Sequence, residues 1–376
     1  MILNGSTSPM DEFTVYPERG ANVTVTAVND NHTTNSFLDP RLIYAEYDDW
    51  VELATVSYYI DQRYLWFIVA FGFPGNIATI FTILRVGQVG TPSFYVLLLA
   101  VVDNLALVVK LLYHQLAMYS VPIGVSGCKS LKFLGSFLVA FANWVLITLA
   151  VERFIAIHFP FSQTSTRKFK MKKAIVVVSV EAGILFCVFA PVLWTHSYIY
   201  DPYLNAMRCG EPDEYRYFVE EIWHWIDSVV YAVIPCISLF TLNVLIIRDT
   251  TRSLKTRTLL TNSINSRRGS NFNVQITAML LTASIVFVVL TLPVCVYYVV
   301  NVYWDVSPYS VQQGWKSIFR DVAYLLCDLS HAVNFYLYFL SARKFRRNFL
   351  KVLMCSRGEK AYQSTNTEVM CSSTYL

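Results

Sequence analysis

The chain has 376 residues, of which 55% are hydrophobic and 15% charged, and its formal net charge is +4. Soluble domains carry about 25% charged residues, so this composition excludes an ordinary soluble protein. It indicates instead one polytopic bundle in a membrane.

The first 61 residues form a polar segment ahead of the first apolar stretch. They hold ten Asp and Glu residues against only Arg19 and Arg41. Three Asn-x-Ser/Thr triplets, the acceptors of N-linked glycans, begin at Asn4, Asn22 and Asn31. No cleavable signal peptide is visible, because the first residues are polar and lack a basic start. We therefore expect residues 1–61 to form a glycosylated extracellular tail.

Seven long apolar stretches follow, and each is long enough to cross a bilayer as a helix of about 20 residues. They cover roughly 64–84, 92–114, 130–151, 173–195, 223–247, 274–300 and 317–340. Basic residues gather in the connections after the first, third and fifth stretches, for example Arg85, Lys170 and Arg252. Cytoplasmic loops carry such an excess. The sequence therefore predicts an all-α membrane protein, a seven-transmembrane helix bundle over 62–341 with its N-terminus outside the cell.

Cys128 and Cys209 are the only two cysteines predicted to lie outside the cell. That environment is oxidising, so a disulfide between them is favoured. The bridge would hold the second outer loop across the third helix. Four other cysteines lie within the apolar stretches, where a small buried residue is the ordinary reading, and no Cys/His spacing predicts a metal site.

Charged residues also lie within or near the apolar stretches, at Asp103, Lys110, Glu181, Asp227 and Asp328. A charge at the centre of a membrane helix costs about 2.5–3.5 kcal/mol on insertion scales, so each should face the bundle interior or pair. Asp227 and Tyr231 are four residues apart and should share one helix face. Such charges can also mark an ion path, which keeps a transporter or channel as an alternative function.

Several short motifs occur in a defined order along the apolar stretches. They are Gly75-Asn76, Asp103, Cys128, Glu152-Arg153-Phe154, Pro235, Pro293 and Asn334-Phe335-Tyr336-Leu337-Tyr338. In this order and spacing the chain resembles rhodopsin-class (class A) G-protein-coupled receptors over about residues 62–355. The resemblance implies a receptor fold, an extracellular ligand and a heterotrimeric G protein as the cytoplasmic partner.

The resemblance also implies roles for particular residues. The inner end of the third helix would couple to the G protein through Glu152, Arg153 and Phe154. An activation network would relay ligand binding to that end through Asn76, Asp103, Phe287, Pro293, Asn334 and Tyr338. The chain departs from the family where the sixth-helix tryptophan is Thr291, where the seventh-helix proline is Phe335, and where Ala142 replaces a polar ligand of the internal sodium site.

The end of the chain resembles the amphipathic helix that lies on the inner membrane face in this family, and we expect that helix over 342–355. Cys355 stands where palmitoylation is common. We expect residues 356–376 to form a disordered cytoplasmic tail. Its Ser and Thr residues fit phosphorylation for arrestin binding, and its last residues, Thr374-Tyr375-Leu376, fit a PDZ-domain ligand. A polar tail without such partners would have the same composition.

The ligand is expected at the outer mouth of the bundle. Gly135 stands where amine receptors of the family carry an aspartate, and Asp328 stands where opsins carry the retinal lysine, so both ligand types are disfavoured. Carboxylates and aromatic rings instead suit a cationic peptide, with Glu220, Glu221, Asp227, Tyr231, Tyr297, Tyr298, Tyr324 and Asp328 as the predicted contacts. The chain looks similar to invertebrate neuropeptide receptors, including those for FMRFamide-like peptides.

Because the second and seventh helices are neighbours in this family, we expect Lys110 and Asp328 to form an ion pair. That pair would leave Asp227, Glu220 and Glu221 as better anchors for a cationic ligand. In the alternative, Lys110 extends to outer water and Asp328 is protonated.

The sequence thus predicts a plasma-membrane receptor that binds an extracellular (neuro)peptide and activates a heterotrimeric G protein. No nucleophile–base arrangement predicts an enzyme, and no cofactor or nucleic-acid partner is expected. The transporter alternative lacks an inverted repeat or a pair of glycine-interrupted helices. Ligand-triggered G-protein activation, against solute uptake or ionic current, would distinguish the two.

Overall fold

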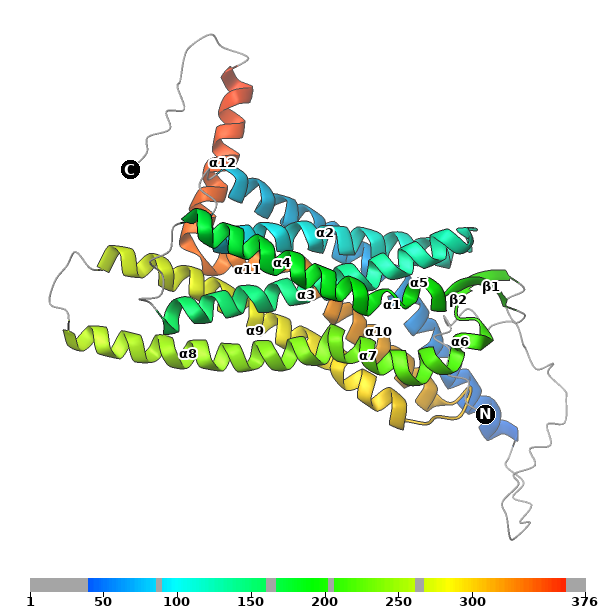
Figure 1. The fold of residues 1–376 in the computed structure, drawn as a ribbon. Helices are drawn as coiled ribbons and strands as arrows, with labels where there is room; N and C mark the ends of the chain where they lie inside the picture. The colour runs from blue at the N-terminus through cyan, green and yellow to red at the C-terminus, as the bar shows by residue number, and fades with distance from the viewer. Residues whose placement is uncertain (1–39, 86–89, 160–166, 202–205, 261–266, 363–376) are drawn as a thin grey trace.

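The computed structural model describes residues 40–85, 90–159, 167–201, 206–260 and 267–362, which form an elongated helical bundle (Figure 1). The elements in chain order are α1 (Pro40–Arg85), α2 (Thr91–Met118), α3 (Gly124–His158), α4 (Arg167–Phe189), α5 (Val192–Thr195), β1 (Ser197–Asp201), β2 (Ala206–Gly210), α6 (Asp213–Tyr217), η3 (Phe218–Trp223), α7 (His224–Ser228), η4 (Val229–Val233), α8 (Ile234–Leu260), α9 (Arg267–Tyr303), α10 (Val311–Ala332), α11 (Asn334–Ser341) and α12 (Arg343–Tyr362). Strands β1 and β2 lie at one end of the bundle, which we call the hairpin end. Helix α12 leaves the opposite end, which we call the α12 end.

Six helical segments are long and apolar enough to cross a membrane within the described residues, and they correspond to the first six predicted stretches. The seventh predicted stretch, 317–340, is divided between α10 and α11, which meet at Val333. The prediction of a multi-pass helical bundle is thus confirmed for six spans. Many large apolar side chains face outward, among them Phe67, Phe240 and Leu292, as expected where lipid replaces water around the bundle.

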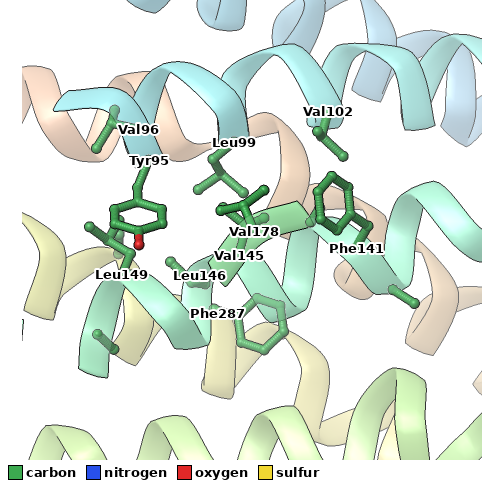
Figure 2. Packing of buried hydrophobic residues seen from close by; sticks show 14 of the residues in the cluster. Tyr95, Val96, Leu99, Val102, Phe141, Val145, Leu146, Leu149, Val178 and Phe287 are labelled. Carbon is green, nitrogen blue, oxygen red and sulfur yellow. The ribbon is translucent and has the colours of Figure 1, made fainter. Parts of the chain in front are cut away.

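The core lies between α2, α3 and α9. Figure 2 shows Tyr95, Leu99 and Val102 of α2 facing Phe141, Val145 and Leu149 of α3. Phe287 of α9 closes this cluster and is 5% exposed. Alanines such as Ala140 and Ala142 are also fully buried here, and small side chains let helix backbones approach closely in membrane bundles.

A β-hairpin lies between α5 and α6 and was not predicted. Strands β1 and β2 pair antiparallel, with Ser197 opposite Gly210 and Tyr198 opposite Cys209. The segment lacks the strict alternation of apolar and polar residues that marks a strand in a sequence. Both strands contact α3, a contact that no local pattern in the sequence reveals.

The fifth predicted stretch contains two π-helical segments, η3 and η4, separated by α7. A π turn adds one residue to the turn and shifts the side chains that follow it around the helix. Tyr231 is nevertheless buried and Asp227 half-buried, so both face inward. The buried Pro235 faces the same way.

Helix α1 begins far ahead of the predicted boundary at residue 62. Trp50 is 3% exposed and Ser57 is fully buried, because this part of α1 packs along α10. The approach is close: a Cβ on Gly314 would lie 2.6 Å from Cβ of Leu53. At the other end, α12 continues to Tyr362, beyond the predicted end at residue 355. The glycan acceptors Asn4, Asn22 and Asn31 lie outside the described residues.

Candidate functional site

The hairpin is joined to the bundle by a disulfide between Cys128 of α3 and Cys209 of β2, which confirms the predicted bridge. Cys128 is fully buried. The Cys128 sulfur also lies 3.2 Å from the backbone carbonyl oxygen of Ser197 in β1. Within the hairpin, the Arg208 guanidinium donates to the Asp201 carboxylate at 2.5 Å and ties the two strands together. The hairpin is therefore fixed above the hairpin end of α3.

Four of the predicted tyrosines come together beneath the hairpin. Tyr297, Tyr298 and Tyr324 lie with their ring centroids 6.1–6.3 Å apart. Tyr231 joins the same buried cluster from η4, and its hydroxyl lies 2.9 Å from Sγ of Cys327. The Tyr324 ring meets the other two edge to face, whereas the rings of Tyr297 and Tyr298 are tilted relative to each other. We call these four residues the tyrosine cluster.

Lys110 and Asp328 form the predicted ion pair, which confirms that expectation. The Lys110 amino nitrogen lies 2.6 Å and 2.7 Å from the two carboxylate oxygens of Asp328. The Tyr64 hydroxyl donates to the same carboxylate at 3.2 Å, so α1, α2 and α10 meet at this point. Lys110 also lies 5.6 Å from the centroid of the Tyr324 ring, at the edge of the tyrosine cluster.

The predicted carboxylates of the fifth stretch are not equivalent. Asp227 faces the interior and its charge acts on Tyr298 and Tyr324. No hydrogen bond or ion pair engages Asp227 among the described residues. Glu220 and Glu221 lie farther toward the hairpin, in η3, and Glu221 is exposed. Nothing in the described part of the chain joins either glutamate to the tyrosine cluster by a hydrogen bond or ion pair.

Sequence reasoning missed a second lysine near this site. Lys132 lies in α3, four residues after Cys128, and its amino nitrogen is 5.5 Å from the centroid of the Tyr113 ring of α2. The signal was a single basic residue in an otherwise apolar stretch. It was overlooked because it stands close to the outer end, where a lysine ordinarily extends into water.

A polar network lies deeper in the bundle, around the fully buried Asp103. Asn334 Nδ2 donates to one carboxylate oxygen at 2.9 Å, and His331 Nδ1 lies 2.8 Å from the other. Asn76 Nδ2 donates to the backbone carbonyl of His331 at 3.1 Å. The structure thus brings together three predicted residues, Asn76, Asp103 and Asn334. It adds His331, whose only signal was a polar residue three positions before Asn334.

The other predicted members of the activation network lie outside this hydrogen-bonded group. Tyr338 is buried, but its hydroxyl has no hydrogen-bond partner among the described residues. Phe287 belongs to the apolar core, and Pro293 lies inside α9. Thr291, at the position of the family's tryptophan, is fully buried and its hydroxyl is likewise unpartnered within the described structure.

The predicted coupling residues lie at the α12 end of α3. The Arg153 guanidinium binds the neighbouring Glu152 carboxylate, with Nε 2.6 Å from Oε2. Arg153 is 8% exposed and borders a small cavity between α3, α8 and α9, lined also by Leu146, Ile246 and Thr277. Phe154 stacks on His158 at 5.3 Å, and His158 Nδ1 lies 2.6 Å from Oδ2 of Asp249 in α8. Cys355 belongs to α12, but its side chain lies outside the described part.

Comparisons with known proteins agree with this arrangement. A family model described as "7 transmembrane receptor (rhodopsin family)" matches residues 75–338. The chain is similar to rhodopsin from Myripristis violacea, with 23% identity over 338 residues that cover 88% of this chain and 92% of the relative. It is also similar to the thyrotropin-releasing hormone receptor of Mus musculus, with 25% identity over 319 residues that cover 77% and 78% of the two chains.

Proposed function

We propose that this chain, which belongs to the rhodopsin family of seven-transmembrane receptors, binds an extracellular peptide at the hairpin end. It would then activate a heterotrimeric G protein at the α12 end. The family supports G-protein signalling in response to an extracellular ligand. The class of ligand is the finer part of the proposal.

One observation carries the peptide assignment. Asp227 is an inward-facing carboxylate without an ion-pair partner among the described residues, and its charge acts on Tyr298 and Tyr324. A guanidinium or ammonium group is bound well by a carboxylate next to aromatic faces. Asp328 is already neutralised by Lys110, which leaves Asp227 as the anchor for a basic side chain. The relative named for a hormone supports a messenger of this kind.

The relatives named rhodopsin raise light as an alternative stimulus. By the family resemblance, Asp328 stands where opsins carry the lysine that binds retinal. Here that position is a carboxylate held by Lys110 and Tyr64. We therefore favour a ligand that diffuses to the site.

The α12 end supports coupling to the G protein. Arg153 is buried against Glu152, and the cavity beside it is small. We assign this arrangement to the resting receptor, in which Arg153 is withheld. A peptide activates such a receptor only if it binds the open state more tightly than the closed state. Asp103, Asn76 and Asn334 would relay the change, with Phe287, Pro293 and Tyr338 repacking around them.

The same proposal fixes the topology. We place the N-terminus outside the plasma membrane, with glycans on Asn4, Asn22 and Asn31, and we assign α10 and α11 together as the seventh span. We assign α12 as the helix on the inner membrane face, anchored by a palmitoyl group on Cys355. Arrestin and a PDZ-domain protein are proposed partners of the tail that follows.

A peptide screen tests this function. Cells that express the full chain would be exposed to a library of short neuropeptides while intracellular calcium and cyclic AMP are recorded. The expected result is a saturable response to a basic peptide that is lost in the Asp227→Asn variant and retained in the Glu221→Gln variant. Solute uptake or ionic current without G-protein activation would instead favour the transporter alternative.

A further inference from the structure

Lys132 is a charged group that the disulfide, the tyrosine cluster and the polar network do not explain. It lies one helical turn below Cys128 on α3, and its amino nitrogen faces the Tyr113 ring of α2. Within the described residues no carboxylate lies within 4.0 Å of it, in contrast to Lys110, which lies 2.6 Å from Asp328. Lys132 is half-buried, so the cation is withdrawn from bulk water without an ion-pair partner.

The groups that face Lys132 come from several elements. Asp227 of α7 and Glu211, which follows β2, are the carboxylates whose charges act on it, both from beyond ion-pair distance. Tyr113 of α2, and His196 between α5 and β1, are the other titratable neighbours. Burial, together with the Lys132 charge, lowers the pKa of His196 to about 4. His196 is therefore neutral at physiological pH, and Lys132 is the cation of this group.

Lys132 and Asp227 are thus a cation and an anion whose charges act on each other but which form no ion pair. Lys132 presents an amino group from α3, and Asp227 presents from α7 a carboxylate whose charge acts on Tyr298. A partly desolvated charge without a partner is unfavourable, and a ligand group of opposite sign removes that cost. Two such charges of opposite sign select a ligand that carries both.

We propose that Lys132 binds a carboxylate of the ligand while Asp227 binds a basic group of the same ligand. This inference rests on the proposed function, and it adds an acidic group to a ligand for which the sequence predicted only a basic one. The carboxylate has two possible sources in a peptide, which are the free C-terminus and an Asp or Glu side chain.

Thermal unfolding of the purified full chain tests the first half, that Lys132 has no ion-pair partner in the empty receptor. The Lys132→Gln variant should unfold at the same temperature as the wild type or higher, because an unpaired charge is removed. Lys110→Gln should unfold at a lower temperature, because it leaves Asp328 unpaired, and Lys129→Gln should match the wild type. If Lys132→Gln lowered the unfolding temperature as much as Lys110→Gln, Lys132 would be part of a structural ion pair.

The peptide found in the library screen tests the second half. It would be assayed as the free acid, as the C-terminal amide, and with each Asp or Glu replaced by Asn or Gln. One of these changes should weaken potency about ten- to hundredfold, as the loss of a charge-assisted hydrogen bond does, and Lys132→Gln should cause a similar loss. The two losses should not add, and Lys132→Arg should retain most of the potency. An active peptide without any carboxylate, or losses that add fully, would overturn the inference.

A probe that needs no agonist separates this inference from the proposed function. The dipeptide arginyl-tyrosine carries a basic group, an aromatic ring and a free carboxylate. At about 10 mM it should raise the unfolding temperature of the wild type, whereas its C-terminal amide should do so less. The difference should vanish in Lys132→Gln. Equal effects of acid and amide on the wild type, or no effect of either, would contradict the anion site even if the peptide screen succeeds, and a failed screen would leave this result intact.

Discussion

Lys110 reaches Asp328 from another helix, and both oxygens of that carboxylate lie within 2.7 Å of its amino nitrogen. The Asp328 side chain is 1% exposed, whereas that of Lys110 is 28% exposed. The carboxylate therefore depends on the pair more than the lysine does, because the lysine retains access to water.

A charge swap tests this pair. Lys110→Asp and Asp328→Lys should each destabilise the receptor by about 3–5 kcal/mol, since each places two like charges in a buried site. The double variant should recover part of the loss. Thermal unfolding and surface expression measure the effect, with Lys129→Asp as the control for a change of charge alone. A double variant as poor as the sum of the two singles would show that the pair does not contribute.

Asp103 depends in the same way on His331. The His331→Ala variant removes one of the two side chains that bind this buried carboxylate. The carboxylate oxygen left without a hydrogen bond should cost about 1–3 kcal/mol of stability. The His114→Ala variant, which loses a more exposed contact with Asp61, should cost about 0–1 kcal/mol. Thermal unfolding compares the two. Equal losses would mean that the Asp103 network is not specially stabilising.

At the scale of the elements, the hairpin is held by one covalent bond to α3. Cys128→Ser and Cys209→Ser should each lower stability by about 2–5 kcal/mol, as the loss of a native disulfide does, and the double variant should be no worse than either. Surface delivery and thermal unfolding report the loss, and Cys187→Ser, an exposed free cysteine, is the control. Mass spectrometry that found both thiols free at the cell surface would refute the bridge.

Helices α3 and α8 are tied at the α12 end by His158 and Asp249. Asp249→Asn weakens this contact, which is partly exposed and worth up to about 1 kcal/mol. If the tie belongs to the resting state, ligand-independent G-protein activity should rise by up to about fivefold. Asp213→Asn, which breaks an exposed pair with Arg216 at the hairpin end, should leave basal activity unchanged. A decrease with Asp249→Asn would assign the tie to the active state.

The sequence predicted the elements better than their ends. Apolar stretches report contact with lipid, so the residues of α1 before 62, with Asp48, Asp49 and Glu52, were expected in the tail. They are helical because Trp50 and Ser57 pack against α10, a contact that no local pattern reveals. The strands of the hairpin were missed for the same reason.

The candidate site shows the same division. Cys128 and Cys209 could be paired because they are the two cysteines predicted outside the cell. Lys110 and Asp328 could be paired because the family resemblance makes the second and seventh helices neighbours. Lys132 and His331 were missed because their importance comes from neighbours distant in the sequence. Asp103 lies 228 residues before His331, and only the packing of α2 against α10 brings the two together.

At the scale of the whole molecule, the ligand and the G protein are proposed at opposite ends of the bundle. Arg153→Ala should largely abolish G-protein activation while ligand affinity changes little. Arg153 lies at the α12 end of α3, whereas the tyrosine cluster lies toward the hairpin end of the bundle. Radioligand binding and nucleotide exchange on the G protein measure the two properties, and Lys351→Ala on α12 is a control for a basic residue at the same end. Full signalling by a normally expressed Arg153→Ala receptor would contradict this role.

The packing of α1 along α10 joins the beginning of the bundle to its end. Ser57 donates to Asp321 and Tyr64 to Asp328, each across 264 residues of chain. Ribosomes add about 5–20 residues per second. Synthesis of the 264 residues between these partners therefore takes roughly 15–50 s, during which α1 is in the bilayer without α10. During that interval Ser57, Tyr64 and Asn76 lack their final partners. A chaperone or a lipid headgroup would stabilise this face of α1 during that interval, and translation arrested before α10 should yield a chain that is inserted but lacks the packing of α1 against α10.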